Sequence, residues 1–157
     1  MKRRREQHLE LPATTASLRE LQQAVERMLA TAAPPVDERT SYEITLAVQE
    51  MAANIVEHAY GGSGGLLRVW IRLLPARFGR PARFIAETED QGTPFVLDLD
   101  SAAQEPAPTE DGLPSLRGRG LYLLVHLMDR VIYEPGPPLN RWRLERQLDG
   151  AHDTGAS

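Results

Sequence analysis

Three side chains that exchange protons or hydrogen-bond follow one another at four-residue intervals: Glu50, Asn54 and His58, in the stretch LAVQEMAANIVEHAYGG. Residues four apart lie on the same face of a helix, so the spacing predicts one polar row beside an apolar stripe. Carboxylate, amide and imidazole groups together have the composition of a polar site. A solvated helix flank without any function explains the same spacing.

A second candidate is Asp90, which ends the strand that we predict in ARFIAETED. By alternation it shares a face with Phe84 and Ala86, which is the core face, and a carboxylate is costly there unless it is hydrogen-bonded. Gly92 follows and lets backbone approach a ligand closely. A buried acceptor beside a glycine turn suits a ligand with donor groups, such as the exocyclic amine of adenine. An Asp that caps an Asp-x-Gly turn explains the pattern equally well.

A third candidate is the pair Gly118 and Gly120, which opens a predicted helix. Free N–H groups at a helix start attract phosphate. Because Lys2 is the only lysine in the chain, phosphate contacts would have to come from that backbone, from Arg117 or Arg119, or from a metal. Taken alone, a Gly-x-Gly pair usually marks only a loop.

Composition narrows the class of protein. The chain of 157 residues is 41% apolar and 25% charged, which suits one globular domain. A net charge of -4 indicates no broad affinity for nucleic acid. There is no cysteine, which excludes a disulfide framework and thiolate chemistry. No apolar run has transmembrane length, and no hydrophobic stretch follows the basic start as in a secretory signal. We therefore expect a cytoplasmic protein.

The elements that must position these residues alternate between strands and helices. In chain order we expect a strand in 7–13, a helix in 15–32, a helix from about Asp37 to Ala59, strands in 66–74 and 82–90, a helix in 118–129, and a final hairpin within 130–148. Thr15 or Ser17 is the expected cap of the first helix, and Pro35 suits the first turn of the second. This order predicts an α+β sandwich.

The domain organisation follows from the same pattern. We expect a basic tail in 1–7, one domain in 8–148 and a disordered tail in 149–157. The KRRR sequence in the first tail suits a solvated arm or a phosphate-binding one. Residues 98–117 are rich in Pro, Ala, Asp and Glu and form a loop longer than compact domains usually carry without a function.

The three motifs together, and in this order, resemble the GHKL ATPase/kinase superfamily. They are EMAAN on a helix, DQGTPF after a strand and GRGLYLL at a helix start. Within that superfamily the stretches around them are most similar to the small anti-sigma-factor serine kinases of bacterial partner-switching systems. The resemblance covers roughly Leu9 to Leu148. It implies a Bergerat-type fold, with a mixed, mostly antiparallel sheet of about five strands and about three helices on one face, and it implies ATP and Mg²⁺ as cofactors.

The resemblance also implies roles for individual residues. Glu50 matches the general base, Asn54 the residue that coordinates magnesium, and His58 a residue that lines the pocket. Asp90 matches the carboxylate that binds the adenine amine, and 98–117 corresponds to the lid over the phosphates. The other residues that it places in nucleotide binding are Gly92 and Phe95, which shape the adenine pocket, and Gly118, Arg119, Gly120 and Leu121 at the helix start that closes over the phosphates.

One departure from the family concerns the last strand. The family often has Thr or Ser there to support the adenine-binding carboxylate, whereas NRWRLERQL has neither, which leaves Thr88 as the candidate. The stretch between DQGTPF and GRG is also acidic and irregular.

The implied function is that of an ATP-dependent protein serine kinase and anti-sigma factor. Such a protein phosphorylates an anti-sigma-factor antagonist, sequesters a sigma factor and forms a homodimer, with no direct nucleic-acid or membrane partner. The alternative is a nucleotide-regulated protein-binding module with little or no kinase activity. Glu50 favours the kinase, because pure binding does not require a base at that position.

Overall fold

The computed structural model describes residues 5–95, 99, 103–104 and 119–148. In chain order the described elements are β1 (Arg5–Pro12), α1 (Thr15–Ala30), α2 (Glu38–Asn54), the π-helical turn η1 (Ile55–Ala59), β2 (Leu66–Leu74), β3 (Arg83–Asp90), α4 (Arg119–Leu127), β4 (Arg130–Glu134) and β5 (Asn140–Gln147). Most of the expected lid at 98–117, and the tail at 149–157, lie outside these residues. The first strand begins at Arg5, so residues 5–7 extend β1 rather than a tail.

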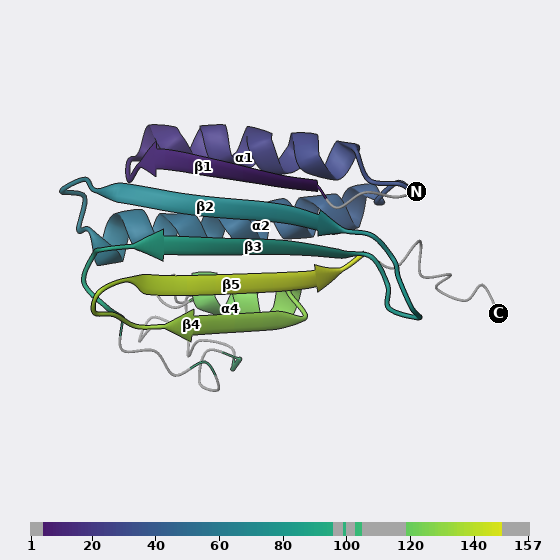
Figure 1. Cartoon of the computed structure of the whole chain (residues 1–157). Helices are drawn as coiled ribbons and strands as arrows, with labels where there is room; N and C mark the ends of the chain where they lie inside the picture. The colour runs from purple at the N-terminus through teal and green to yellow at the C-terminus, as the bar shows by residue number, and fades with distance from the viewer. Residues whose placement is uncertain (1–4, 96–98, 100–102, 105–118, 149–157) are drawn as a thin grey trace, which may run out of the picture.

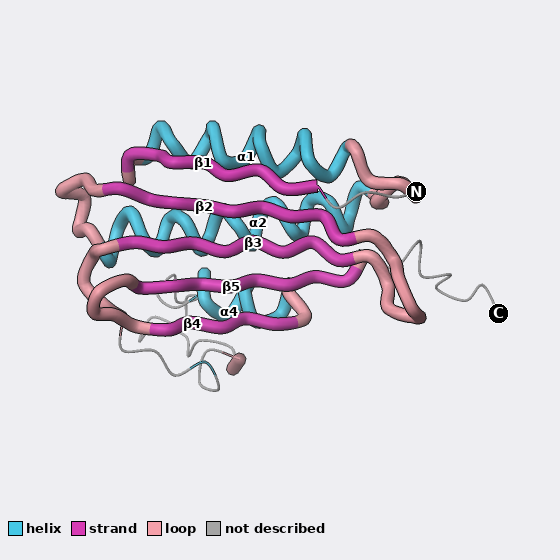
Figure 2. The backbone as a smooth tube through the Cα atoms, viewed as in Figure 1, coloured by secondary structure: helices cyan, strands magenta, loops and turns pink. Residues whose placement is uncertain are grey.

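The five strands form one sheet in the order β1-β2-β3-β5-β4 (Figure 2). The helices α1, α2 and α4 cover one face of it (Figure 1), so the expected α+β sandwich is confirmed. Every described pairing is antiparallel rather than mixed. Between β1 and β2 the chain passes through two helices, which return it to the sheet end where β1 finished. The next strand must therefore run back beside β1.

Alternation along β2 and β3 divides the two faces of the sheet as predicted. The core-facing residues of the two strands are buried: Leu67, Val69, Ile71, Leu73, Phe84, Ala86, Thr88 and Asp90. The opposite face carries a ladder of charges, in which Arg72 pairs with Glu6 and Glu87. Asp90 consequently ends β3 with its side chain on the helix-covered face.

The helices bury the stripes that their periodicity predicts. Ile44, Val48, Met51 and Ile55 are all fully buried, which leaves Glu50 and Asn54 half-buried on the shoulder of the stripe. The caps differ by a few residues from those expected. Thr14 rather than Thr15 or Ser17 caps α1, and it accepts a hydrogen bond from the Ser17 N–H. Asp37 caps α2 by accepting from the Thr40 N–H at 2.6 Å, so Pro35 lies in the connecting loop rather than in the first turn.

The second helix changes pitch at its C-terminal end. From Ile55 to Ala59 it is π-helical, and the Tyr60 N–H donates to the carbonyl of Ile55 five residues earlier. Because a four-residue step does not return to the same face in this wider turn, the predicted row holds for Glu50 and Asn54 but does not continue regularly to His58. Among the described helices, none has the length and apolar character needed to cross a membrane.

Candidate functional site

Glu50 and Asn54 meet the start of α4 at Gly120. A Cβ atom at position 120 would lie 2.7 Å from Glu50 Oε2 and 3.8 Å from Asn54 Nδ2. A side chain there would displace the Glu50 carboxylate, which is the end of a flexible side chain, so glycine allows this contact without such a shift. The structure therefore brings together the first motif and the third, which are about seventy residues apart in the sequence.

The environment of this contact favours reactivity over simple packing. Partial burial raises the pKa of Glu50 above its ordinary value, and the charge of Glu57 adds to the effect. Within the described part of the chain, Asn54 Nδ2 is buried without a hydrogen-bond partner. Buried polar atoms are usually paired, so an unpaired one is a candidate ligand contact.

Asp90 offers one unsatisfied acceptor. The residue is only 1% exposed. Oδ1 accepts from the Gly92 N–H and from Asn140 Nδ2, both at 2.9 Å. Oδ2 is buried and has no hydrogen-bond partner among the described residues. Burial raises the pKa of Asp90, while the two hydrogen bonds oppose that rise. A carboxylate with one oxygen held by two donors and the other oxygen unpaired is suited to accept a hydrogen bond from a ligand.

Asn140 is the residue that sequence reasoning missed. It is the first residue of β5 and lies directly opposite Asp90 in the strand register. The prediction that Thr88 supports Asp90 is wrong, because Thr88 Oγ1 is buried and has no hydrogen-bond partner in the described part of the chain. The only sequence signal was a polar residue at the start of a strand that otherwise alternates. Without the register of β3 against β5, that signal cannot be connected to Asp90.

Gly92 is required for a contact within the chain. A Cβ atom there would lie 2.6 Å from the backbone carbon and oxygen of Ala59. The Thr93 N–H donates to the same Ala59 oxygen at 2.7 Å. Gly92 therefore lets the loop after β3 pack on the end of the π-helical turn, whereas the sequence suggested close approach to a ligand.

Phe95 and His58 lie beside this loop. The Phe95 N–H donates to the Tyr133 hydroxyl at 2.8 Å, and the Phe95 ring packs against Tyr133 and Trp142. The His58 ring meets Phe95 edge-on, with the centroids 6.3 Å apart, and its side chain is 63% exposed. His58 thus lies at the solvent-exposed edge of Phe95.

The remaining predicted residues are at the start of α4. Arg119 is its first residue, and Leu121 packs half-buried against the core. Gly118 lies outside the described residues. The described part of α4 therefore places Gly120 against Glu50 and Asn54.

The described side chains would hold a magnesium ion only as part of a nucleotide complex. No group of three His, Cys, Asp or Glu residues in the described ranges is placed to bind a metal. Mg²⁺ commonly keeps several waters and takes one or two protein ligands together with substrate phosphates. A single neutral amide oxygen from Asn54 fits that pattern if the amide turns, because in this structure Nδ2 is the Asn54 atom nearest Gly120.

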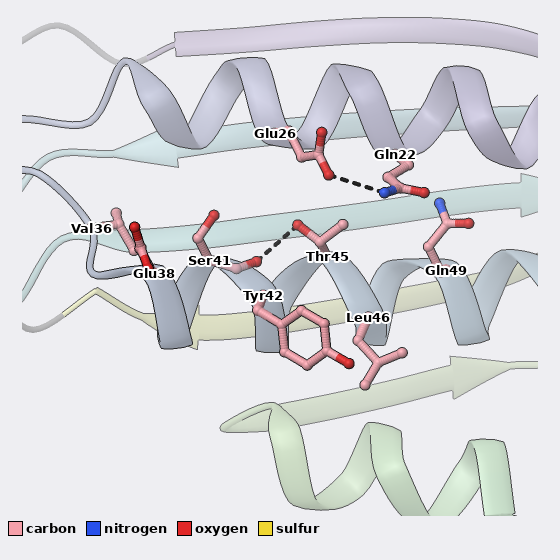
Figure 3. Close-up of a pocket in the computed structure, with 9 residues that line it drawn as sticks. All are labelled: Gln22, Glu26, Val36, Glu38, Ser41, Tyr42, Thr45, Leu46 and Gln49. Atoms are coloured by element: carbon pink, nitrogen blue, oxygen red, sulfur yellow. Dashed lines mark hydrogen bonds between the residues drawn. The ribbon is translucent and has the colours of Figure 1, made fainter.

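A separate hollow of about 470 Å³ lies between α1 and α2 (Figure 3). Two of its polar pairs are satisfied internally. Gln22 donates to Glu26 at 3.0 Å, and the Thr45 hydroxyl donates to the Ser41 carbonyl at 2.8 Å. None of the predicted site residues lines this hollow.

Comparison with known families agrees with the geometry. Residues 11–145 match the model of the histidine kinase-like ATPase domain, so the chain belongs to that family. The predicted GHKL membership is confirmed. No curated protein matches the chain.

Among solved structures, the chain resembles the RsbU and RsbW domains of Rv1364c from Mycobacterium tuberculosis, with a TM-score of 0.59 and 18% identity. The match covers 92% of this chain but only 32% of that one. This likeness establishes the fold.

Proposed function

We propose that this chain is an ATP-dependent protein serine kinase and anti-sigma factor, which phosphorylates an anti-sigma-factor antagonist and otherwise sequesters a sigma factor. The observation that carries the proposal is the convergence of Glu50, Asn54 and Gly120 at the start of α4. A half-buried carboxylate with a raised pKa, beside the place where phosphates would sit, suits a base. Membership in the ATPase family supports the use of ATP. The serine specificity and the partners rest on the sequence resemblance.

In this proposal each residue has a separate task. Asp90 Oδ2 accepts from the exocyclic amine of adenine, and the N–H groups at the start of α4 face the phosphates. Asn54 supplies an amide oxygen to Mg²⁺, which neutralises phosphate charge when it is bound with the nucleotide. Glu50 orients the serine hydroxyl of the antagonist and takes its proton late in the transfer. His58 and Phe95 border the pocket, Arg119 and Leu121 belong to the phosphate-facing end of α4, and Gly118 comes directly before that helix in the sequence.

The binding-module alternative loses its main support. It drew on the missing Thr or Ser of the last strand, which would have left Asp90 without a partner. Asn140 supplies the hydrogen bond to Asp90 instead, so this departure does not weaken the adenine end of the site.

Three broader features complete the proposal. Residues 8–148, extended by residues 5–7 of β1, act as one kinase domain, residues 98–117 serve as its lid, and the protein works in the cytoplasm as a homodimer.

The test is single-turnover transfer from labelled ATP to the cognate antagonist, identified by what co-purifies with the protein from its own cell. We expect phosphate on a serine of the antagonist. If a verified partner receives no phosphate from protein that binds ATP, the binding-module function replaces the kinase.

A further inference from the structure

Asn140 uses its whole side-chain amide to join the end of β3 and its following loop to the turn before β5. It is 2% exposed. Nδ2 donates to Asp90 Oδ1 at 2.9 Å and to the Gly92 carbonyl at 2.8 Å, and Oδ1 accepts from the Gly136 N–H at 2.7 Å. Both N–H groups of the amide are therefore engaged. The partners also fix its orientation, because a flipped amide would point its oxygen at two acceptors.

This arrangement decides which oxygen of Asp90 a ligand can reach. Oδ1 already accepts from the Gly92 N–H and from Asn140. Oδ2 is left as the buried acceptor without a partner in the described structure. The amide of Asn140 thus sets the direction of the carboxylate, and its donated hydrogen bond favours the charged form.

We propose that Asn140 is a positioning residue, which holds Asp90 as an ionised acceptor and thereby makes the site select 6-aminopurine over 6-oxopurine nucleotides. This inference rests on the proposed nucleotide-binding function. An ionised carboxylate can only accept hydrogen bonds. The amine at position 6 of adenine donates to it, whereas the oxygen at position 6 of hypoxanthine would face a second acceptor.

Burial is already the largest influence on the pKa of Asp90, and loss of the Asn140 donor would leave only the Gly92 N–H to oppose it. Burial favours the protonated form of Asp90, and a protonated Oδ2 would donate to a 6-oxo group instead of accepting from a 6-amino group. Selectivity between the two bases should then fall. The pH range over which selectivity changes should also lie higher than in the wild type.

The other groups around Asp90 do not replace Asn140 in this role. Leu67, its neighbour on β2, is apolar. Tyr133 on β4 interacts with the charge of Asp90, and burial raises the pKa of its hydroxyl, which keeps it neutral at physiological pH. The other ionisable side chains of the candidate site are His58 on the π-helical turn and Glu50 on α2. Because all three titratable residues remain in every variant, differences between variants report on position 140.

The experiment compares ADP with IDP, which carry the same sugar and phosphates and differ at position 6 and in the proton on N1. Calorimetry would measure both affinities from acid to neutral pH for the wild type, Asn140→Asp and Asn140→Ala. Asn140→Asp keeps the shape and the acceptor for the Gly136 N–H but places a second carboxylate beside Asp90. Arg141→Ala is the matched control, because Arg141 is the next residue of β5 and its side chain pairs with Glu89 on the opposite face.

We expect the wild type to prefer ADP by about 10²-fold or more, as sites built to hydrogen-bond one substrate group do. In both Asn140 variants the ratio of ADP to IDP affinity should fall by at least about tenfold, the value of one hydrogen bond to a charged group. The acid limb of ADP binding should move to higher pH, most strongly in Asn140→Asp. The control should match the wild type.

Two results would overturn the inference while leaving the proposed function in place. If folded Asn140 variants lose ADP and IDP affinity by the same factor, Asn140 only supports the fold. An unchanged ratio and pH profile would show that Asp90 needs no help from Asn140. If Asn140→Ala fails to fold, the isosteric Asn140→Asp decides the matter alone. A wild type that binds neither nucleotide would instead remove the proposed function, and this inference with it.

Discussion

Glu50 and Asp90 are both carboxylates whose pKa burial raises, but their surroundings suit them to different tasks. Asp90 has one oxygen held by two donors, which favours a stable charge and a fixed direction. Glu50 has no such donors among the described residues, and a neighbouring acid raises its pKa further. The first environment suits the recognition group that we propose, and the second suits the proposed base.

Replacing Glu50 by Gln should separate catalysis from stability. Transfer to the antagonist should fall by about 10²–10⁴-fold, the usual contribution of a positioned base, while ATP affinity changes little. Single-turnover transfer from labelled ATP would measure the loss. A wild-type rate in the variant would exclude Glu50 as the base.

The same variant should not lose stability at neutral pH. Because the folded-state pKa of Glu50 is raised, the folded protein binds this proton more tightly than the unfolded chain does. Its contribution to stability is present below the unfolded pKa and is lost as pH rises through the folded pKa. At neutral pH the charged Glu50 therefore opposes folding. Urea titration should show a free energy of unfolding for Glu50→Gln equal to or above that of the wild type.

Replacing Asp90 by Asn should weaken nucleotide binding. The amide either presents a donor to the adenine amine or accepts from it more weakly, and loss of a hydrogen bond to a charged group is worth about 1.5–3 kcal/mol. ADP affinity measured by calorimetry should fall by about 10- to 150-fold. Glu89→Gln, on the opposite face of the same strand, should leave it unchanged. Equal affinity of folded Asp90→Asn and wild type would remove Asp90 from the site.

Replacing Asn54 by Ala should reduce the increase in ATP affinity that magnesium provides. Its amide oxygen is a neutral hard ligand of the kind that Mg²⁺ accepts. The variant should therefore lose much more ATP affinity in magnesium than in a chelator, as titration calorimetry under both conditions would show. Equal losses would mean that Asn54 is only structural.

At the scale of elements, the hairpin between β2 and β3 contains a strained residue. The backbone groups of Arg77 and Arg80 bond to each other in both directions, at 3.0 and 2.9 Å. The two residues between them both have positive φ, 51° at Phe78 and 78° at Gly79. This is the pattern of a type I′ turn, which favours Asn-Gly. Phe78 is 95% exposed, so packing does not offset the strain.

Replacing Phe78 by Asn should therefore stabilise the protein. A bulky side chain in the left-handed region costs about 1 kcal/mol or more, and Asn tolerates that region better. The free energy of unfolding in urea should rise by roughly 1 kcal/mol. The matched control is Gly79→Ala, which adds a side chain at positive φ and should destabilise. A neutral or destabilising Phe78→Asn would mean that the turn carries no such strain.

At the scale of the molecule, the site lies at one end of the sandwich. There β3 ends, β5 begins, and α2 meets the start of α4 (Figure 1). A ligand that joins Asp90 to the start of α4 would link the sheet to the helix layer. Its binding should stabilise the whole fold rather than one element.

ADP with magnesium should raise the melting temperature. Ligand at a hundred times its dissociation constant stabilises by about 2.7 kcal/mol. At about 2–4 °C per kcal/mol for a chain of this size, the shift should be roughly 5–10 °C. Differential scanning fluorimetry would measure it, and Asp90→Asn should show a smaller shift at the same concentration. A wild type without any shift at saturating ADP would contradict nucleotide binding at this site.

Local periodicity was enough to predict much of this protein. Alternation placed Asp90 on the buried face of its strand, and four-residue spacing placed Glu50 and Asn54 side by side on their helix. Both inferences needed only neighbours in the sequence, because the repeats of a strand and a helix are properties of the backbone. The order of the three motifs added the family and its ATP chemistry.

The tertiary structure decided what supports those residues. Asn140 lies 50 residues beyond Asp90, and only the register of β5 on β3 places the two opposite each other. Gly120 lies against Glu50 because α4 packs on α2, and His58 leaves the row because the helix widens into a π turn. Register, packing and pitch depend on which distant surfaces are buried together, and no local repeat encodes that choice.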